Sequence, residues 1–156
     1  MNDRLQTTLV FLRQNDQVLL ASKKRGHGAA KWNGVGGKIE PGETPEQAAR
    51  RECREEINVD PLTIAKMGLL HFHQEPPIDT YSNQDSHVFV CDTWQGEPKE
   101  SDEMAPRWFD VTDIPYDNMW SDDIYWLPLL LDSRTFEGDF YFDQDNTLLH
   151  HEVTTS

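Results

Sequence analysis

Residues 37–59, GKIEPGETPEQAARRECREEINV, hold the turn and the helix that decide the fold. A Pro-Gly pair indicates a turn, and Thr44, which follows it, is a residue type favoured at the N-cap of a helix. Gln47, three residues later, completes a capping-box pattern. The helix is expected to run to about Ile57, because Asn58 readily takes the left-handed conformation with which helices end.

Three glutamates share one face of this predicted helix. Glu52, Glu55 and Glu56 are spaced i, i+3 and i+4, so their carboxylates lie side by side. They repel one another unless a cation lies among them, and a cluster of oxygen ligands suits Mg²⁺, or Mn²⁺, rather than zinc. Arg51 is adjacent and can pair with Glu43 across the turn. These five are candidate catalytic residues; the alternative for the three glutamates alone is a solvated acidic helix face.

The rest of the chain is predicted to place strands on both sides of this helix. Residues 7–11 and 18–20 flank an Asn-Asp turn, which is typical of a hairpin. Further strands are expected at residues 63–72, 87–91, 107–111 and 136–142, with a mostly helical segment at 115–131 whose packing residues are Trp120, Tyr125, Trp126, Leu129 and Leu130. In the first helix an apolar stripe can pack on the sheet: Ala49, Cys53 and Ile57. This order predicts an α/β fold, a mixed β-sheet sandwiched between helices.

Length and charge limit the possible functions. A chain of 156 residues suits one compact domain, here taken as residues 1–156. The formal net charge of −14 argues against a nucleic-acid polymer as partner, although a small phosphorylated ligand remains possible when a divalent cation offsets its charge. No apolar stretch is long enough for a membrane span, and the N-terminus lacks a secretory signal pattern. Two cysteines, Cys53 and Cys91, make no disulfide scaffold, so a cytoplasmic protein is expected.

Residues 37–59 resemble the Nudix box, which is a glycine, five residues, a glutamate, seven residues and then Arg-Glu-x-x-Glu-Glu. Cys53 stands where a larger aliphatic residue is usual, and Asn58 stands where glycine is usual. The resemblance implies the Nudix fold and a Mg²⁺-dependent hydrolase that splits a nucleoside triphosphate into a monophosphate and pyrophosphate.

The resemblance extends beyond the box. Residues 23–26 (KKRG), 32–34 (WNG), 100–104 (ESDEM) and 119–123 (MWSDD) are similar to segments of the animal MutT-homologue enzymes. Those enzymes remove oxidised purine nucleoside triphosphates such as 8-oxo-dGTP and 2-hydroxy-dATP from the nucleotide pool. The likeness implies the same substrates and a small-molecule nucleotide as the partner. The protein is expected to be a monomer.

The likeness also implies which residues form the site. The metal ligands it implies are the carbonyl of Gly36 and the side chains of Glu52, Glu55, Glu56 and Glu103. The substrate-binding residues it implies are Thr8, Lys23, Asn33, Val35, Gly36, Gly37, Lys38, Phe72, Met104, Trp120, Asp122 and Asp123. Among these, Lys23 is expected near the sugar and Lys38 near the phosphates.

The chemistry of the implied base pocket is reasonable. Trp120 offers a flat apolar face to a purine, and the Asn33 amide can both donate and accept at a base edge. Asp122 and Asp123 should not both ionise in an apolar pocket, so one of them is expected to hold a proton and donate it in a hydrogen bond. The alternatives are core packing for Trp120, a helix cap for the aspartates and a surface position for Glu103.

Three differences between this sequence and the family concern the choice of substrate. His27 and Val35 each stand where the family has phenylalanine, and residues 80–85 form a longer segment that lacks the family's methionine. A Nudix hydrolase of alkylated nucleotides, ordinary dNTPs or dinucleotides is therefore the alternative reading. A module that binds nucleotides without cleaving them is a third, although such modules usually lose box glutamates.

Overall fold

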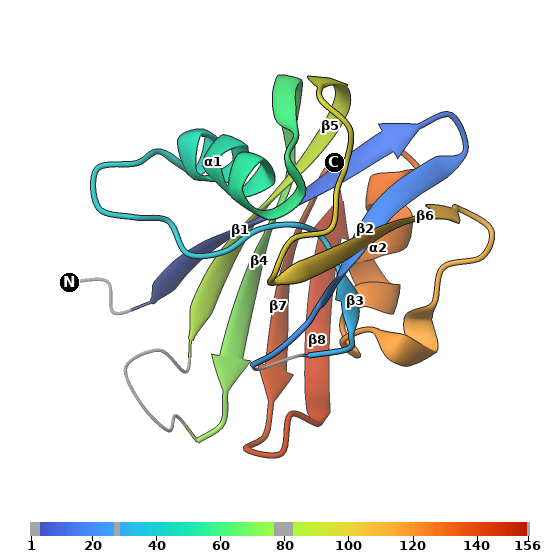
Figure 1. Cartoon of the computed structure of the whole chain (residues 1–156). Helices are drawn as coiled ribbons and strands as arrows, with labels where there is room; N and C mark the ends of the chain where they lie inside the picture. The colour runs from blue at the N-terminus through green and yellow to red at the C-terminus, as the bar shows by residue number, and fades with distance from the viewer. Residues whose placement is uncertain (1–3, 27–28, 77–82, 156) are drawn as a thin grey trace.

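The computed structural model describes residues 4–26, 29–76 and 83–155, which form one mixed sheet with a helix on each side (Figure 1). The strands are β1 (Leu5–Gln14), β2 (Gln17–Lys23), β3 (Trp32–Asn33), β4 (Asp60–Gln74), β5 (Gln84–Gln95), β6 (Met104–Asp110), β7 (Phe136–Phe142) and β8 (Leu148–Thr155). The helices are α1 (Pro45–Ile57), the short 3₁₀ helix η1 (Tyr116–Asn118) and α2 (Asp123–Leu131). The predicted fold class is confirmed.

The strand order brings four strand ends to one edge of the sheet. Within the described residues the order is β3-β2-β1-β5-β4-β7-β8, with β6 paired to β2. β1 runs parallel to β5, β4 runs antiparallel to β5, and β7 runs parallel to β4. The starts of β1 and β5 therefore meet the ends of β4 and β7 at the same edge.

The core is divided between the two faces of the sheet. On one face, α1 contributes the predicted stripe of Ala49, Cys53 and Ile57 to a buried cluster. On the other face, α2 contributes Trp126 and Leu130 to a second cluster. Because the side chains of a strand alternate between faces, each central strand supplies both clusters.

The segment 115–131 is mostly helical, as predicted, but in two pieces, because residues 119–122 separate η1 from α2 and Met119 is extended. One prediction about this part needs correction. Tyr125 is 44% exposed and stacks on His151, so it is not a core residue. Strand β8 was not predicted from the sequence, because its exposed, histidine-rich residues show no apolar alternation.

Cys53 and Cys91 are both buried and free, as expected. No helix among the described residues is long and apolar enough to cross a membrane.

Candidate active site

The first helix begins and ends as its sequence predicts. The Thr44 hydroxyl accepts a hydrogen bond from the Gln47 N–H (3.1 Å), and the Thr44 N–H donates to the Gln47 side chain (2.9 Å). Asn58 ends the helix with φ of 62°, in the left-handed region. Together these caps fix where the glutamates of α1 lie relative to the preceding loop.

Arg51 ties the loop to the helix. Its guanidinium donates to Glu43 at 2.7 and 3.0 Å and to the Lys38 carbonyl at 3.0 Å. It also donates to Glu52 (3.0 Å) and Glu55 (3.2 Å). The hydrogen bond from Arg51 holds the pKa of Glu43 below its usual value. The predicted pairing of Arg51 with Glu43 is thus present, and it pins the turn against the helix.

Glu52 and Glu56 face inward from α1. Glu52 is only 7% exposed, and one Glu56 carboxylate oxygen is buried without a hydrogen-bond partner. Burial, together with the adjacent Glu52 and the charge of Glu103, raises the pKa of Glu56 to about 8. A buried carboxylate oxygen without a hydrogen-bond partner destabilises the folded protein. A cation bound between Glu52 and Glu56 would offset this cost.

The candidate metal ligands are oxygen atoms, which suit a hard divalent cation, but their side chains do not converge on one point. Among the described residues, no three His, Cys, Asp or Glu side chains are close enough to hold a metal ion. Glu55, on the same helix face, is turned to the exposed surface and bonds Arg51. Glu52, Glu56 and Glu103 all line one cavity and supply only oxygen, the donor that Mg²⁺ prefers. The residues present therefore fit such an ion once their side chains converge.

The glycine loop before α1 pairs with β1 through backbone hydrogen bonds. The Thr8 N–H donates to the Gly37 carbonyl (2.9 Å), and Val10 and Val35 exchange backbone hydrogen bonds at 2.6 and 3.0 Å. A Cβ at Gly36 would lie 1.8 Å from the Thr8 carbonyl oxygen, whereas one at Gly37 would meet the Glu52 carboxylate at 2.6 Å. The loop can approach β1 this closely only because glycine occupies position 36, whereas glycine at position 37 leaves room for the Glu52 side chain of α1.

Gly36→Ala should therefore destabilise the fold by about 3 kcal/mol or more, because the added methyl group meets backbone that is fixed in the sheet. Gly37→Ala is the matched control, and it should cost less than half as much, since the Glu52 side chain can turn away. Urea unfolding of both variants measures the difference. A Gly36→Ala loss below about 1 kcal/mol, the level of an ordinary substitution, would show that the loop is not held as described.

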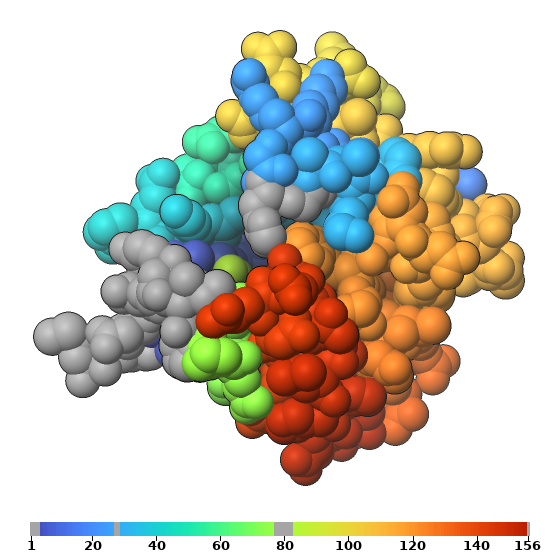
Figure 2. All heavy atoms as spheres, turned by 90° about the horizontal axis from the view of Figure 1, so that it is seen from below, coloured from blue at the N-terminus to red at the C-terminus, as the bar shows by residue number. Residues whose placement is uncertain are grey.

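A cavity of about 800 Å³ joins the carboxylates of α1 to a pocket beneath α2. Figure 2 views the molecule from below, with the β7–β8 hairpin in front; residues of this hairpin and of β3 both line the cavity. Thirteen predicted site residues line this cavity: Thr8, Lys23, Asn33, Gly36, Gly37, Glu52, Glu56, Phe72, Glu103, Met104, Trp120, Asp122 and Asp123. The structure thus brings together residues from nearly the whole chain.

Five predicted residues lie elsewhere. Val35 is fully buried in the core on the α1 side. Glu43, Arg51 and Glu55 form the ion-pair group at the end of the loop. The Lys38 carbonyl accepts a hydrogen bond from Arg51.

Asp122 and Asp123 are almost completely buried, at 3% and 2% exposure. Asp122 accepts a hydrogen bond from the Trp126 indole (2.7 Å) and makes no side-chain cap bond to α2. Burial, then the charge of Asp122, raises the pKa of Asp123 well above its usual value, and burial also raises that of Asp122. One Asp123 oxygen is buried without a hydrogen-bond partner. Both raised pKa values favour a proton on the pair at neutral pH, and both residues line the cavity, while the helix-cap alternative lacks its hydrogen bond.

Other polar groups of the pocket are positioned by local contacts. The Asn33 side-chain oxygen accepts from the Gly34 N–H (2.8 Å), which sets the orientation of the amide. The Lys31 ammonium lies 5.4 Å from the centre of the Trp120 ring, a cation–π geometry. Trp120 is half-buried at the cavity rather than a core residue.

Several lining residues were not predicted as site residues from the sequence, among them Lys31, Gln74, Gln84, Ser86, Phe142, Gln144 and Asn146. Phe142 could have been found, because the alternation of β7 places it on the same face as Phe140. The amides could not, since they reach the cavity from strand ends and a hairpin with no motif of their own. His27 and residues 80–82 of the segment 80–85 lie outside the described residues.

Comparison with known proteins agrees with this geometry. The NUDIX domain model matches residues 3–130. The chain is 47% identical to the oxidized purine nucleoside triphosphate hydrolase of Danio rerio, over 94% of this chain and 92% of the relative, and 42% identical to that of Mus musculus over the same shares. The MutT protein from Bacillus halodurans has the same fold, with a TM-score of 0.84, 26% identity, and coverage of 96% of this chain and 97% of that one. The chain therefore belongs to the Nudix hydrolase family.

Proposed function

We propose that this enzyme hydrolyses oxidised purine nucleoside triphosphates, of the 8-oxo-dGTP and 2-hydroxy-dATP type, to the monophosphate and pyrophosphate. The observation that carries the proposal is the single cavity, which has buried aspartates at one end and the carboxylates of α1 at the other. A purine bound at the first end would extend its phosphates toward the second. The names of the two vertebrate relatives support the same substrate class.

The base is expected to bind between Trp120, Asn33 and the aspartate pair. Trp120 provides an apolar surface on which a purine can stack. A pair of carboxyl groups that shares one proton offers a donor as well as acceptors, so the two together match a base edge that both donates and accepts. Oxidation of a purine changes its pattern of donors and acceptors, and a buried pair of this kind is sensitive to that change because an unmatched polar group is costly in a dry pocket.

The metal is proposed to be Mg²⁺, with Mn²⁺ as a substitute. Nudix enzymes generally use a divalent metal ion. The proposed ligands are the Gly36 carbonyl, Glu52, Glu55, Glu56 and Glu103, of which Glu55 has to leave its hydrogen bond with Arg51. A bound ion would supply charge stabilisation for the phosphoryl oxygens and lower the pKa of a coordinated water.

The chain's own residues supply the remaining roles. Arg51 holds Glu52 and the loop in place through its hydrogen bonds to Glu43 and Lys38. Lys23 lines the cavity close enough to Glu56 for its charge to lower the pKa of that carboxyl. This places a cation where a nucleotide would pass from the base pocket to the carboxylates. We further propose that the enzyme is monomeric and cytoplasmic, the latter because its two cysteines are unpaired.

Replacement of Asp123 by Asn tests the base assignment. The variant fixes a neutral amide where the pair now shares a proton, so the two oxidised substrates should lose activity unequally, by roughly 5- to 150-fold in kcat/KM for the more affected one. The measurement compares kcat/KM for 8-oxo-dGTP and 2-hydroxy-dATP, alongside a melting curve. Equal losses on both substrates together with a lower Tm would instead assign Asp123 to the stability of α2.

A further inference from the structure

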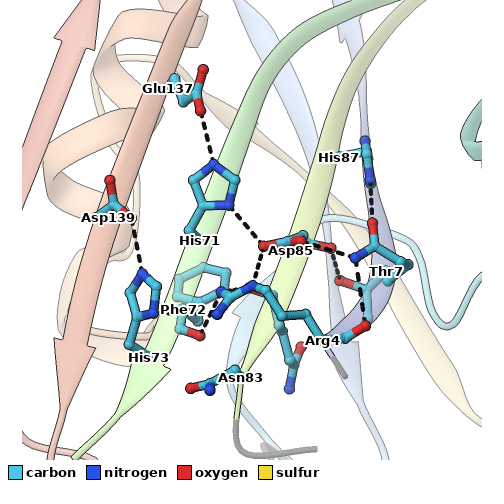
Figure 3. A network of polar contacts seen from close by, with 12 residues as sticks. Arg4, Thr7, His71, Phe72, His73, Asn83, Asp85, His87, Glu137 and Asp139 are labelled. Carbon is cyan, nitrogen blue, oxygen red and sulfur yellow. Dashed lines mark hydrogen bonds and ion pairs between the residues drawn. The ribbon is translucent and has the colours of Figure 1, made fainter. Parts of the chain in front are cut away.

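The face of the sheet opposite α2 carries a polar network that the proposed reaction does not use (Figure 3). Its side chains come from the segment preceding β1, from β1 itself and from β4, β5 and β7. We call it the outer-face network, and it consists of Arg4, Gln6, His71, His73, Asp85, His87, Glu137 and Asp139.

Asp85 is the centre of this network. One carboxylate oxygen accepts from Arg4 (2.6 Å) and contacts His71 Nδ1 (2.7 Å), and the other accepts from Gln6 (2.9 Å). Burial alone would raise the pKa of Asp85, but the hydrogen bonds from His71, Gln6 and Arg4 outweigh it and bring the value to about 2. Asp85 is therefore an ionised, fixed anchor for the Arg4 guanidinium at any pH near neutral.

The network lies directly behind the wall of the cavity. Along β4, Phe72 faces the cavity and its neighbour His71 belongs to the network alone, whereas His73, near the end of the strand, bonds Asp139 in the network and also lines the cavity. Along β5, Gln84 and Ser86 line the cavity on either side of Asp85. Alternation along each strand thus leaves only the thickness of the sheet between the two sets of side chains.

The Arg4 side chain hydrogen-bonds to the backbone of the two strands that form this wall. Its guanidinium donates to the carbonyl oxygens of Phe72 (3.1 Å) and Gln84 (2.9 Å), both of which are cavity-lining residues. Phe72 and Gln84 are also register partners, and theirs is the terminal pair of the β4–β5 ladder. One side chain therefore joins the two strands at the point where their ladder ends and the cavity begins.

We propose that Arg4 and Asp85 are positioning residues for the base pocket: Asp85 holds the Arg4 guanidinium, which fixes the Phe72–Gln84 wall against which the purine ring packs. The inference rests on the proposed function, because it takes this end of the cavity to be the purine site. It assigns a role in substrate binding to Arg4 and Asp85, neither of which lines the cavity.

The arrangement predicts which kinetic constant changes. The wall is made by β4 and β5, whereas the carboxylates of the reaction come from α1 and the segment before β6. Loosening the wall should therefore weaken binding of the base and leave the chemical step largely intact. A small misplacement of a positioning group can cost up to about 100-fold, so a rise in KM of roughly 10-fold or more is expected.

The test compares four variants with the wild-type enzyme on 8-oxo-dGTP. Arg4→Ala should raise KM roughly 10-fold or more with kcat within about twofold. Asp85→Asn, which preserves shape but removes the anchor, should change KM in the same direction. Arg4→Lys should not restore KM, because an ammonium cannot reproduce the fork that binds Asp85 and two carbonyls. Lys66→Ala is the matched control; it removes a cation from the same region of the sheet, where Lys66 bonds His87 (2.9 Å), and should leave both constants unchanged.

A second readout needs no substrate. Amide hydrogen exchange should quicken in residues 69–76 and 83–88 of Arg4→Ala and stay unchanged in α1, with Lys66→Ala again as the control. Unchanged KM and unchanged exchange in Arg4→Ala, or full rescue by Arg4→Lys, would overturn the positioning role. If the wild-type enzyme does not hydrolyse 8-oxo-dGTP, the proposed function fails instead, and the exchange measurement still decides whether Arg4 fixes the wall.

Discussion

Glu56→Gln should reduce kcat by at least about 100-fold while leaving nucleotide binding largely intact. Glu56 points from α1 into the cavity with one oxygen buried and unpartnered, which makes it a principal candidate ligand for the ion. The amide has nearly the same shape but offers the ion one neutral oxygen in place of a carboxylate. The base pocket is built from other segments, so the Kd of the monophosphate product, measured by Trp fluorescence, should change little.

Glu46→Gln is the control for this variant. Glu46 is on the same helix, but it is exposed and pairs with Arg50 at 3.1 Å. Its loss removes one surface ion pair and should leave kcat unchanged. Turnover by Glu56→Gln within tenfold of the parent enzyme would show that the inner face of α1 is not the catalytic face.

Removal of divalent cations should abolish turnover altogether. Glu52, Glu56 and Glu103 line the cavity that would receive a triphosphate, and without a cation this arrangement brings like charges together. Exhaustive chelation followed by exchange into metal-free buffer should bring pyrophosphate release to the background level, and Mg²⁺ should restore it, with Mn²⁺ as a partial or full substitute. Melting curves with and without chelator show whether the fold itself survives. Full activity in the metal-free protein would contradict the assignment of the carboxylates as metal ligands.

The helix of the active site could be predicted in detail because its signals are local. The capping box at Thr44, the C-cap at Asn58 and the pairing of Arg51 with Glu43 all connect residues within one turn and one helix. The spacing of the glutamates then follows from helical geometry alone. What spacing could not show is that the Glu55 side chain turns outward and bonds Arg51.

The base pocket could be predicted only in part, since it is formed by long-range contacts. Trp120 and the aspartates were identified through family resemblance, whereas local pattern favoured a helix across 115–131. The helical segment is instead interrupted at residues 119–122. Asp122 accepts a hydrogen bond from the Trp126 indole and makes no side-chain hydrogen bond that would cap α2. Burial of both aspartates depends on packing between α2 and the sheet, which no short segment encodes.

The outer-face network had no signal in the sequence. Arg4 and Asp85 are 81 residues apart, and neither belongs to a motif. Only the parallel pairing of β1 with β5 brings them together, and strand pairing across such a distance is decided by the whole fold.

The most direct test of the central claim is the kcat/KM for 8-oxo-dGTP relative to dGTP, measured by pyrophosphate release from the purified protein in Mg²⁺. A pocket that reads the oxidised edge with the Asp122–Asp123 pair should favour 8-oxo-dGTP by roughly 5- to 150-fold, the value of one matched hydrogen bond in a dry site. The products should be the monophosphate and pyrophosphate. Equal rates on the two nucleotides, a preference for dGTP, or release of orthophosphate in place of pyrophosphate would contradict the account.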